Sequence, residues 1–459
     1  MTSADSSRRY SEGAGKTTIN VWLTDPASLP THGGNLAVSA AIEFNAAHPE
    51  YHIEIVSRDY LTMPEEVAQA AERGEAPDLA EYHFTLNRAA LDSLRPDGER
   101  LYTPIDRAIA GRTEILGERV VTDDMVPVAR DYFRYAGELT SMPRTASGAV
   151  LYANMDVLAR AGVTELPRTW REVTAVCEAI AKLPDGPTHG IAWPNMYWFF
   201  LQAVAQQGGL IVDNDNGHSG RAEKVDLAST EMLAFVEWWK SLHRAGHFLY
   251  TGKTSDFGSC FAGFENQEVA LVVSSSVDTS HMLDRAERSR FRVQVGRLPY
   301  NDEVEFAGNM TGGFAFWLAA GLSPAKQDGA LAFLQYLNTP RIAAEWAKQH
   351  FRIPVTKSAI DVLEAEGLYR DNPNLRVAGD QLLASGTSPA VLGPFMGSHA
   401  DIMGEITSAM HDVLTGDVEP AARFAEASTR AQQILDAYNS HCDGPPRRTP
   451  GRRALVVSL

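Results

Sequence analysis

The chain has few of the residues and motifs that mark metal-binding and disulfide-rich proteins. Its 459 residues hold three cysteines, none in a Cys-x-x-Cys pair, and no histidine stands at metal spacing to one of them. This excludes a structural zinc site and a disulfide framework. It leaves open whether Cys177 and Cys260 pair with each other.

Positive charge and long apolar runs are also scarce. Lys and Arg number 41 against 58 Asp and Glu, and the formal net charge of -17 argues against nucleic acid as a partner. Apolar runs are strand-sized, such as Val269 to Val273, and no transmembrane span is predicted. The polar N-terminus carries Arg8 and Arg9 with no apolar segment behind them, so it lacks the form of a signal peptide.

Motifs that carry catalytic chemistry are missing or incomplete. Neither His-Glu-x-x-His nor Gly-x-Ser-x-Gly occurs, and we assign no catalytic residue. Residues 13–18 imitate a phosphate loop, but Tyr10 stands where the motif needs glycine. Residues 213–217 begin like a calcium loop, but Lys224 replaces the bidentate glutamate, and we expect a polar turn there. The sequence therefore predicts no metal site and no cofactor.

Strand and helix patterns alternate along the N-terminal part. The predicted strands and helices are, in chain order, 18–23, 35–48, 51–57, 63–74 and 77–82. This alternation is typical of α/β layers with a mainly parallel sheet. Residues 1–17 and 441–459 are polar, and we predict that both are disordered.

The segment from Ser141 to Trp170 has the most specific pattern. A polar stretch enters an apolar strand that ends at Asn154, a residue that can cap the helix after it. Pro167 and Thr169 then mark the start of a second helix. This order resembles the sugar and glycerol-phosphate group of solute-binding proteins that serve ATP-binding-cassette (ABC) importers. In that group a polar segment, a Tyr-Tyr-Asn strand end, an Ala-Gly helix end and Pro-x-Thr-Trp follow one another.

Further segments match the same family in the same order. They are Phe44-Asn45-Ala46-Ala47-His48-Pro49, Gly74-Glu75-Ala76-Pro77-Asp78-Leu79, Phe333-Leu334-Gln335-Tyr336-Leu337, Glu345-Trp346 and Arg352-Ile353-Pro354-Val355. The resemblance covers roughly residues 18–440. It implies an α/β, two-lobed periplasmic-binding-protein-like fold of type II, with discontinuous lobes joined by a hinge.

The resemblance also predicts how the chain divides. We assign residues 18–145 plus 276–313 to lobe 1 and 146–275 plus 314–440 to lobe 2, with the hinge at the junctions. In such proteins the lobes close on a buried ligand, and a membrane permease recognises the closed form.

Candidate ligand contacts come from strand ends, from the chain crossings and from an aromatic cluster. Ligands bind beyond the carboxyl ends of strands in open α/β sheets, aromatic rings pack on the C–H faces of sugars, and glycine allows close backbone approach. The residues chosen on these grounds are Trp22, Asp25, Glu81, His83, Ser147, Trp193, Tyr197, Trp198, Ser275, Gly312, Gly313, Phe314 and Phe395. Two alternatives stay open: the charged residues can be solvated loop residues, and the rings near Trp193 can belong to the core.

The resemblance implies a small polar organic ligand, either a carbohydrate or a polyol or glycerophosphodiester-like molecule. Relatives that take glycerol phosphates use an arginine before Leu-Gly, where Val391 stands here, so that route to a phosphate group is missing. The implied partners are ABC permease subunits, and we expect a monomer.

Two settings for the protein remain open. The family implies an extracytoplasmic or cell-surface location, whereas the absence of a signal peptide implies a cytoplasmic one if the recorded start is genuine. The functional alternative is an intracellular protein, for example a biosynthetic enzyme, that reuses the fold and its cleft, because a fold alone does not fix a function.

Overall fold

The computed structural model describes residues 15–24, 36–59, 62–416 and 418–443. The chain divides into two compact units. Unit 1 comprises Met1–Ala146, Gly313–His350 and Pro354–Leu363, and unit 2 comprises Ser147–Gly312, Phe351–Ile353 and Glu364–Leu459. The chain therefore crosses from one unit to the other several times.

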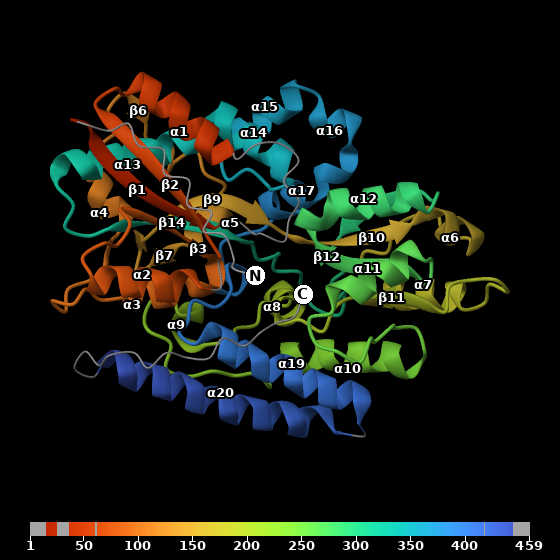
Figure 1. Ribbon diagram of the computed structural model, residues 1–459. Helices are drawn as coiled ribbons and strands as arrows, with labels where there is room; N and C mark the ends of the chain where they lie inside the picture. Colours follow the sequence, from red (N-terminus) through yellow and green to blue (C-terminus); the bar gives the residue numbers. More distant parts are fainter. Residues whose placement is uncertain (1–14, 25–35, 60–61, 417, 444–459) are drawn as a thin grey trace, which may run out of the picture. The chain divides into compact units, whose positions relative to one another are not determined.

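Unit 1 is built on a mixed β-sheet. The strands of this sheet are β1 (Thr17–Thr24), β2 (Tyr51–Arg58), β3 (Leu79–His83), β4 (Tyr102–Thr103), β9 (Met142–Ser147) and β14 (Gly312–Ala319). Two separate two-stranded sheets are formed by β5 (Glu114–Ile115) with β6 (Glu118–Arg119) and by β7 (Arg134–Tyr135) with β8 (Glu138–Leu139). The main sheet has the order β2-β1-β3-β14-β4, and β9 pairs with β14. β1 runs parallel to both of its neighbours, β2 and β3, whereas β14 is antiparallel to β3. Figure 1 shows β1 and β2 side by side.

Helices surround this sheet and supply the core of unit 1. They are α1 (Leu36–Ala47), α2 (Met63–Glu72), η1 (Phe84–Leu86), α3 (Asn87–Asp92), α4 (Ile105–Ile109), α5 (Pro127–Asp131), α13 (Pro324–Leu337), α14 (Pro340–His350) and α15 (Lys357–Ala365). Met63 and Val67 are four residues apart, so both lie on one side of α2. They pack with Tyr82 and Trp317 in a buried cluster.

Unit 2 has its own mixed sheet with the order β11-β12-β10-β13. These strands are β10 (Ala149–Asn154), β11 (His189–Ala192), β12 (Val269–Ser275) and β13 (Val293–Arg297). β11 is parallel to β12, whereas β10 is antiparallel to both β12 and β13. The carboxyl ends of β11, β12 and β13 therefore lie at the same edge of this sheet. Successive residues of β10 and β12 are buried on both faces of the sheet, which explains why the two strands are almost wholly apolar.

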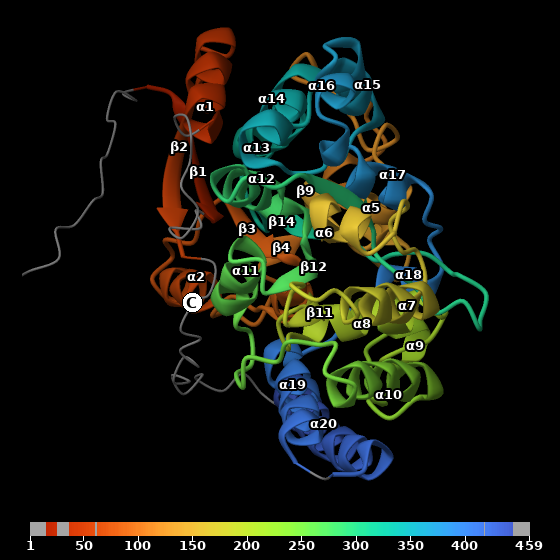
Figure 2. The ribbon, with the colours of Figure 1, turned by 90° about the vertical axis from the view of Figure 1, so that its right-hand side faces the viewer.

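The helices of unit 2 complete its core. They are α6 (Met155–Arg160), α7 (Trp170–Ile180), α8 (Tyr197–Gln206), α9 (Asp213–Asn216), α10 (Thr230–Arg244), α11 (Phe257–Glu265), η2 (Ser276–Asp278), α12 (Thr279–Arg288), α16 (Leu368–Asp371), η3 (Pro373–Leu375), α17 (Val377–Leu383), α18 (Pro389–Leu392), α19 (His399–Thr415) and α20 (Pro420–Asp443). Figure 2 shows the two closing helices, α19 and α20, side by side as they are in Figure 1.

The caps predicted after the strand at residue 154 are confirmed. The Asn154 side chain accepts hydrogen bonds from the N–H groups of Asp156 and Val157, both at 3.1 Å. Thr169 accepts from the N–H of Glu172, whose carboxylate accepts from the N–H of Thr169, so the two form a capping box. Side-chain caps fix both helix starts in the register that the sequence predicted.

Removing the Thr169 cap should destabilise unit 2. Thr169→Ala is expected to lower the free energy of unfolding by about 1–2 kcal/mol, because an N–H group at the helix start loses its partner. Thr169→Ser keeps the hydroxyl and should stay within about 0.5 kcal/mol of the parent. Urea unfolding followed by circular dichroism measures both, and equal losses in the two variants would contradict the role of the hydroxyl.

The predicted assignment of residues 276–313 and 314–440 needs correction. The chain does not leave unit 2 after Ser275, because β13 pairs with β10 in the same sheet. It leaves after Gly312, and β14 then enters the sheet of unit 1 beside β3. The sheets are also mixed rather than mainly parallel, since β10 and β14 run against their neighbours.

The predicted termini also differ from the structure. Thr17 already belongs to β1, and α20 extends through residues 441–443. The rest of the two predicted disordered segments, 1–14 and 444–459, lies outside the described residues. Within the described part, none of the helices combines the length and hydropathy needed to cross a lipid bilayer.

The structure does not join Cys177 to Cys260. Both thiols are free and buried, and burial raises the pKa of each to about 12. Cys177 packs against Gly190, where an added Cβ would lie 2.4 Å from the sulfur. Cys177 is therefore a core residue of unit 2.

Candidate functional site

In unit 1, two predicted ligand contacts meet at the carboxyl end of β3. His83 and Phe314 are cross-strand partners on β3 and β14, and their rings lie edge to face with centroids 5.1 Å apart. Nδ1 of His83 lies 2.8 Å from Oγ1 of Thr85, and both rings are half-buried. A histidine beside an aromatic ring at a strand end can offer a ligand both a polar group and an apolar face.

Two other predicted contacts of unit 1 have different outcomes. Trp22 is half-buried on β1, where the guanidinium of Arg58 lies 4.5 Å from its ring centroid. That cation is also paired with Glu66 at 2.9 Å, so the ring is covered by a fixed ion pair. Asp25 lies outside the described residues.

Glu81 does not face a ligand as the sequence predicted. Its side chain is fully buried and accepts hydrogen bonds from Thr24 and Arg144. Both carboxylate oxygens are therefore occupied inside unit 1. Sequence reasoning missed Arg144, although it stands in the most specific segment of the chain, because nothing in the pattern showed its partner.

In unit 2, the predicted serines lie together beside the first chain crossing. The Ser276 N–H donates to the carbonyl of Gly148 at 2.8 Å, and the Gly148 N–H donates to Oγ of Ser276 at 3.2 Å. Ser147, which precedes Gly148, is buried, and Ser275, which pairs with Ala149 across the sheet, is half-buried. Ser275 is the last residue of β12, at the edge where α/β sheets bind ligands, and its hydroxyl accepts from the N–H of Val277 at 3.4 Å.

A tyrosine and an aspartate that sequence reasoning missed support this serine cluster. The Tyr152 hydroxyl donates to the carbonyl of Ser275 at 2.7 Å and lies 3.0 Å from Oγ1 of Thr279. The Ser274 hydroxyl donates to Asp278 at 2.6 Å. Burial raises the pKa of both Tyr152 and Asp278. The sequence shows Tyr152 only as one residue of an apolar strand. The fold shows that its hydroxyl reaches Ser275 and Thr279.

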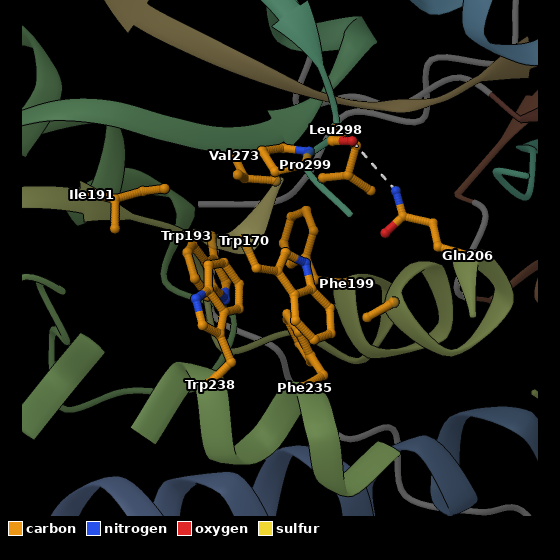
Figure 3. A pocket seen from close by; sticks show the side chains of 11 residues that line it. Trp170, Ile191, Trp193, Phe199, Gln206, Phe235, Trp238, Val273, Leu298 and Pro299 are labelled. Atoms are coloured by element: carbon orange, nitrogen blue, oxygen red, sulfur yellow. Dashed lines mark hydrogen bonds between the residues drawn. The ribbon is translucent and has the colours of Figure 1, made fainter. Parts of the chain in front are cut away.

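Trp193 belongs to the core of unit 2, contrary to the prediction that it stacks on a ligand. It is 2% exposed, and its ring packs against Trp238, Trp239 and Phe248 with centroids 5.6, 4.9 and 4.5 Å away. Figure 3 shows the ring beside Trp238 at the wall of a cavity with room for about one water molecule. The cavity is lined by Trp170, Ile191, Trp193, Phe199, Ala203, Gln206, Phe235, Trp238, Val273, Leu298 and Pro299.

The other aromatic candidates of unit 2 divide between the core and its margin. Phe395 is 1% exposed and packs 5.4 Å from the ring of His218, so it is a core residue, contrary to the prediction. Trp198 is 7% exposed at the start of α8. Tyr197 is half-buried, and its ring meets that of His399 edge to face at 5.6 Å. Tyr197 therefore remains the best aromatic candidate for a ligand contact.

His399 makes the stability of unit 2 depend on pH. Burial lowers its pKa from 6.5 to about 3. Between these values the unfolded chain binds a proton and the folded chain does not, so stability falls as pH drops below about 6.5. At pH 5 we expect a loss of about 2 kcal/mol relative to pH 7.5. His399→Gln should remove this part of the pH dependence in thermal melts, and an unchanged dependence would contradict the assignment.

The two glycines at the second crossing have different surroundings. Gly312 is the last residue of unit 2, and its carbonyl accepts a hydrogen bond from Oγ1 of Thr311 at 2.9 Å. Gly313 opens the return to unit 1 with a φ of 148°. A Cβ on Gly313 would lie 2.0 Å from the carbonyl oxygen of Thr145. Close approach of β9 and β14 therefore explains this glycine without a ligand.

Within the described residues, no group of three or more His, Cys, Asp or Glu side chains is placed to hold a metal ion. The arrangement offers hydrogen bonds and ring faces to a ligand. The chemistry that it supports is binding.

Comparison with known proteins gives this arrangement a context. The profile of a family described as bacterial extracellular solute-binding protein matches residues 39–377 of the chain. The chain belongs to this family. It is 26% identical over 433 residues to the sn-glycerol-3-phosphate-binding periplasmic protein UgpB of Escherichia coli K12, covering 92% of this chain and 93% of that protein.

Solved structures confirm the predicted fold. The chain is similar to UgpB from Mycobacterium tuberculosis in complex with glycerophosphocholine, with 20% identity, a TM-score of 0.69 and coverage of 92% and 99% of the two chains. It is also similar to the sugar-binding protein MalE from Xanthomonas citri, with 18% identity, a TM-score of 0.74 and coverage of 94% and 100%. The predicted function as the solute-binding component of an ABC importer is thereby supported, and the enzyme alternative is not.

Proposed function

We propose that this protein binds a carbohydrate, or a polyol or glycerophosphodiester-like molecule, and delivers it to the permease of an ABC importer. The observation that carries the proposal is the gathering of polar groups and rings at strand ends in each unit. In unit 1 these are His83 and Phe314. In unit 2 they are Ser147 and Ser275, the last residues of β9 and β12, together with Tyr197 at the start of α8. Sugars and polyols need both fixed hydrogen-bond partners and ring faces.

A neutral or zwitterionic ligand fits the chain better than glycerol 3-phosphate. Val391 stands where the phosphate-binding relatives are expected to carry arginine, and it is fully buried in α18. A buried valine cannot supply the positive charge that would balance the phosphate of glycerol 3-phosphate. A neutral ligand needs no such charge, and a zwitterion carries its own cation. The names of the relatives, which include binders of sugars and of glycerophosphocholine, support the same range of ligands.

The experiment is isothermal titration of the purified protein with a panel of glycerol 3-phosphate, glycerophosphocholine, maltose and longer maltodextrins. We expect saturable binding of a neutral or zwitterionic member and no turnover of it. His83→Ala should weaken that binding at least about tenfold, the scale of one lost hydrogen bond in a buried site. Conversion of a panel member into product would overturn the proposal. Selective binding of glycerol 3-phosphate would overturn the preference for a neutral or zwitterionic ligand.

We further propose that the protein acts outside the cytoplasm as a monomer and does not bind nucleic acid. The family and the net charge of -17 support this setting. Light scattering coupled to gel filtration measures the oligomeric state, and fractionation of the native host measures the location. A dimer at micromolar concentration, or recovery in the cytosol, would contradict the corresponding part.

A further inference from the structure

A buried ion pair lies inside unit 1 at a place where no ligand contact explains it. The Nε of Arg144 donates to the carboxylate of Glu81, and the two side chains are 9% and 0% exposed. Taking two charges out of water costs about as much as their attraction returns, so such a pair is weak evidence for stability. Stability alone therefore does not explain why the interior of unit 1 contains this ion pair.

The carboxylate of Glu81 also holds the end of a neighbouring strand. Both the N–H and the hydroxyl of Thr24 donate to Oε2 of Glu81, at 2.9 and 2.7 Å, while Oε1 faces Arg144. Thr24 is the last residue of β1, and Glu81 lies in β3. One carboxylate therefore ties the end of β1 to β9, the strand that carries Arg144.

Besides Glu81, Arg144 contacts two aromatic rings that lie close to crossings of the chain. Arg144 precedes Ala146, where the chain first leaves unit 1. Its guanidinium lies 5.8 Å from the ring centroid of Phe316, shortly after the chain returns at Gly313. It lies 4.0 Å from the ring centroid of Trp346, on α14, the helix at whose end the chain leaves unit 1 again. One side chain thus contacts the unit-1 end of three crossings.

We propose that Glu81 and Arg144 are positioning residues that hold the unit-1 ends of these three crossings in one fixed arrangement, the base on which ligand-driven movement turns. The link to ligand binding rests on the function proposed above. A guanidinium suits this task because it stacks on a ring while its N–H groups bond in its own plane. Nη1 of Arg144 is buried with no hydrogen-bond partner in the described part of the chain. The position of the guanidinium is therefore set by its bond to Glu81 and its stacking on Trp346, and not every N–H group of it is hydrogen-bonded.

Unit 1 offers a matched control. Arg88 and Asp92 form a second buried ion pair, at 2.8 Å, with side chains 3% and 5% exposed. This pair lies within α3, away from every crossing. Replacing it by apolar residues makes the same chemical change without touching β9, β14 or α14.

The test compares the double variant Glu81→Leu/Arg144→Met with Arg88→Met/Asp92→Leu by hydrogen–deuterium exchange in the absence of any ligand. We expect the control to melt within about 5 °C of the parent, because apolar replacement of a buried pair is often neutral. The first variant should melt lower than the control, because the buried N–H and hydroxyl of Thr24 also lose their acceptor. Only the first should speed exchange, by roughly tenfold, in residues 142–147, 313–319 and 340–350. Unchanged exchange there, or equal acceleration by the control, would overturn the proposal.

A single variant guards against a double variant that fails to fold. Arg144→Lys keeps the charge but cannot both stack on the Trp346 ring and bond to Glu81 in the same plane. We expect a folded protein with faster exchange in the same three segments, and exchange equal to the parent would also overturn the proposal. Because no ligand is used, this outcome is independent of the titration panel that tests the proposed function.

Discussion

Gly313→Ala should reduce the free energy of unfolding of unit 1 by about 3–5 kcal/mol, and Gly313→Val should prevent folding. The backbone at this position has a φ of 148°, which residues with a side chain rarely adopt, and the strain costs about 1–3 kcal/mol. The added Cβ would also lie 2.0 Å from the carbonyl oxygen of Thr145, so β9 and β14 must move apart. Urea unfolding followed by circular dichroism measures the loss.

Gly404→Ala is the matched control for this change. Gly404 lies inside α19 with nothing within 4 Å of an added Cβ, so the same substitution should stabilise the protein by up to about 1 kcal/mol. The glycine pair in the sequence fits either a ligand approach or a tight contact between chain segments, and the geometry of Gly313 favours the contact. A stable Gly313→Ala protein that has lost only ligand binding would reverse this conclusion.

Trp193→Ala should remove about 3–5 kcal/mol from the stability of unit 2, the usual cost of deleting a buried large ring. The ring is 2% exposed and packs against four other aromatic side chains. Three of them, Phe235, Trp238 and Trp239, are on helix α10. The small cavity beside it would grow instead of closing, because the neighbouring rings cannot collapse into the space. A drop in melting temperature of roughly 6–20 °C is expected in calorimetry.

Tyr197→Ala separates the core from the margin of the aromatic cluster. This ring is half-buried at the start of α8, and its loss should cost less than about 2 kcal/mol of stability. If it contacts the ligand, binding should weaken by about 1–3 kcal/mol in titration. A Trp193→Ala protein as stable as the parent, with ligand affinity lost, would show that our placement of these two rings is inverted.

Local features were predictable because short-range physics specifies them. The apolar spacing located β1, α1 and β2 to within one or two residues, and Asn154 and Thr169 marked the helix starts. Capping oxygens act on N–H groups only two or three residues away, so a single sequence contains all the information.

Strand pairing was not predictable in the same way. The sequence correctly shows that the chain crosses between units near residues 145 and 313, but which sheet receives β13 and β14 depends on partners more than a hundred residues away. The predicted lobe assignment therefore failed at 276–313, where no local signal distinguishes a return from a continuation.

The candidate site was only partly predictable for a related reason. His83 and Phe314 were chosen separately, and the fold brings them together as cross-strand partners. Glu81 was chosen as a charged residue near a strand end. It shares a face of β3 with His83, but Thr24 and Arg144 occupy its carboxylate inside unit 1. A sequence shows where a residue lies along a strand, but it does not show which distant side chain neutralises the charge of that residue.

The place of β14 has a consequence for the synthesis of the chain. This strand lies between β3 and β4 in unit 1, yet it is made after all of residues 147–312. At about 5–20 residues per second, a ribosome needs roughly 10–35 s to pass from the first crossing to the second. Throughout that interval the first sheet has an open slot where its inner strand belongs. A factor that recognises unpaired strand edges would therefore have many seconds to bind the nascent chain before unit 1 can close.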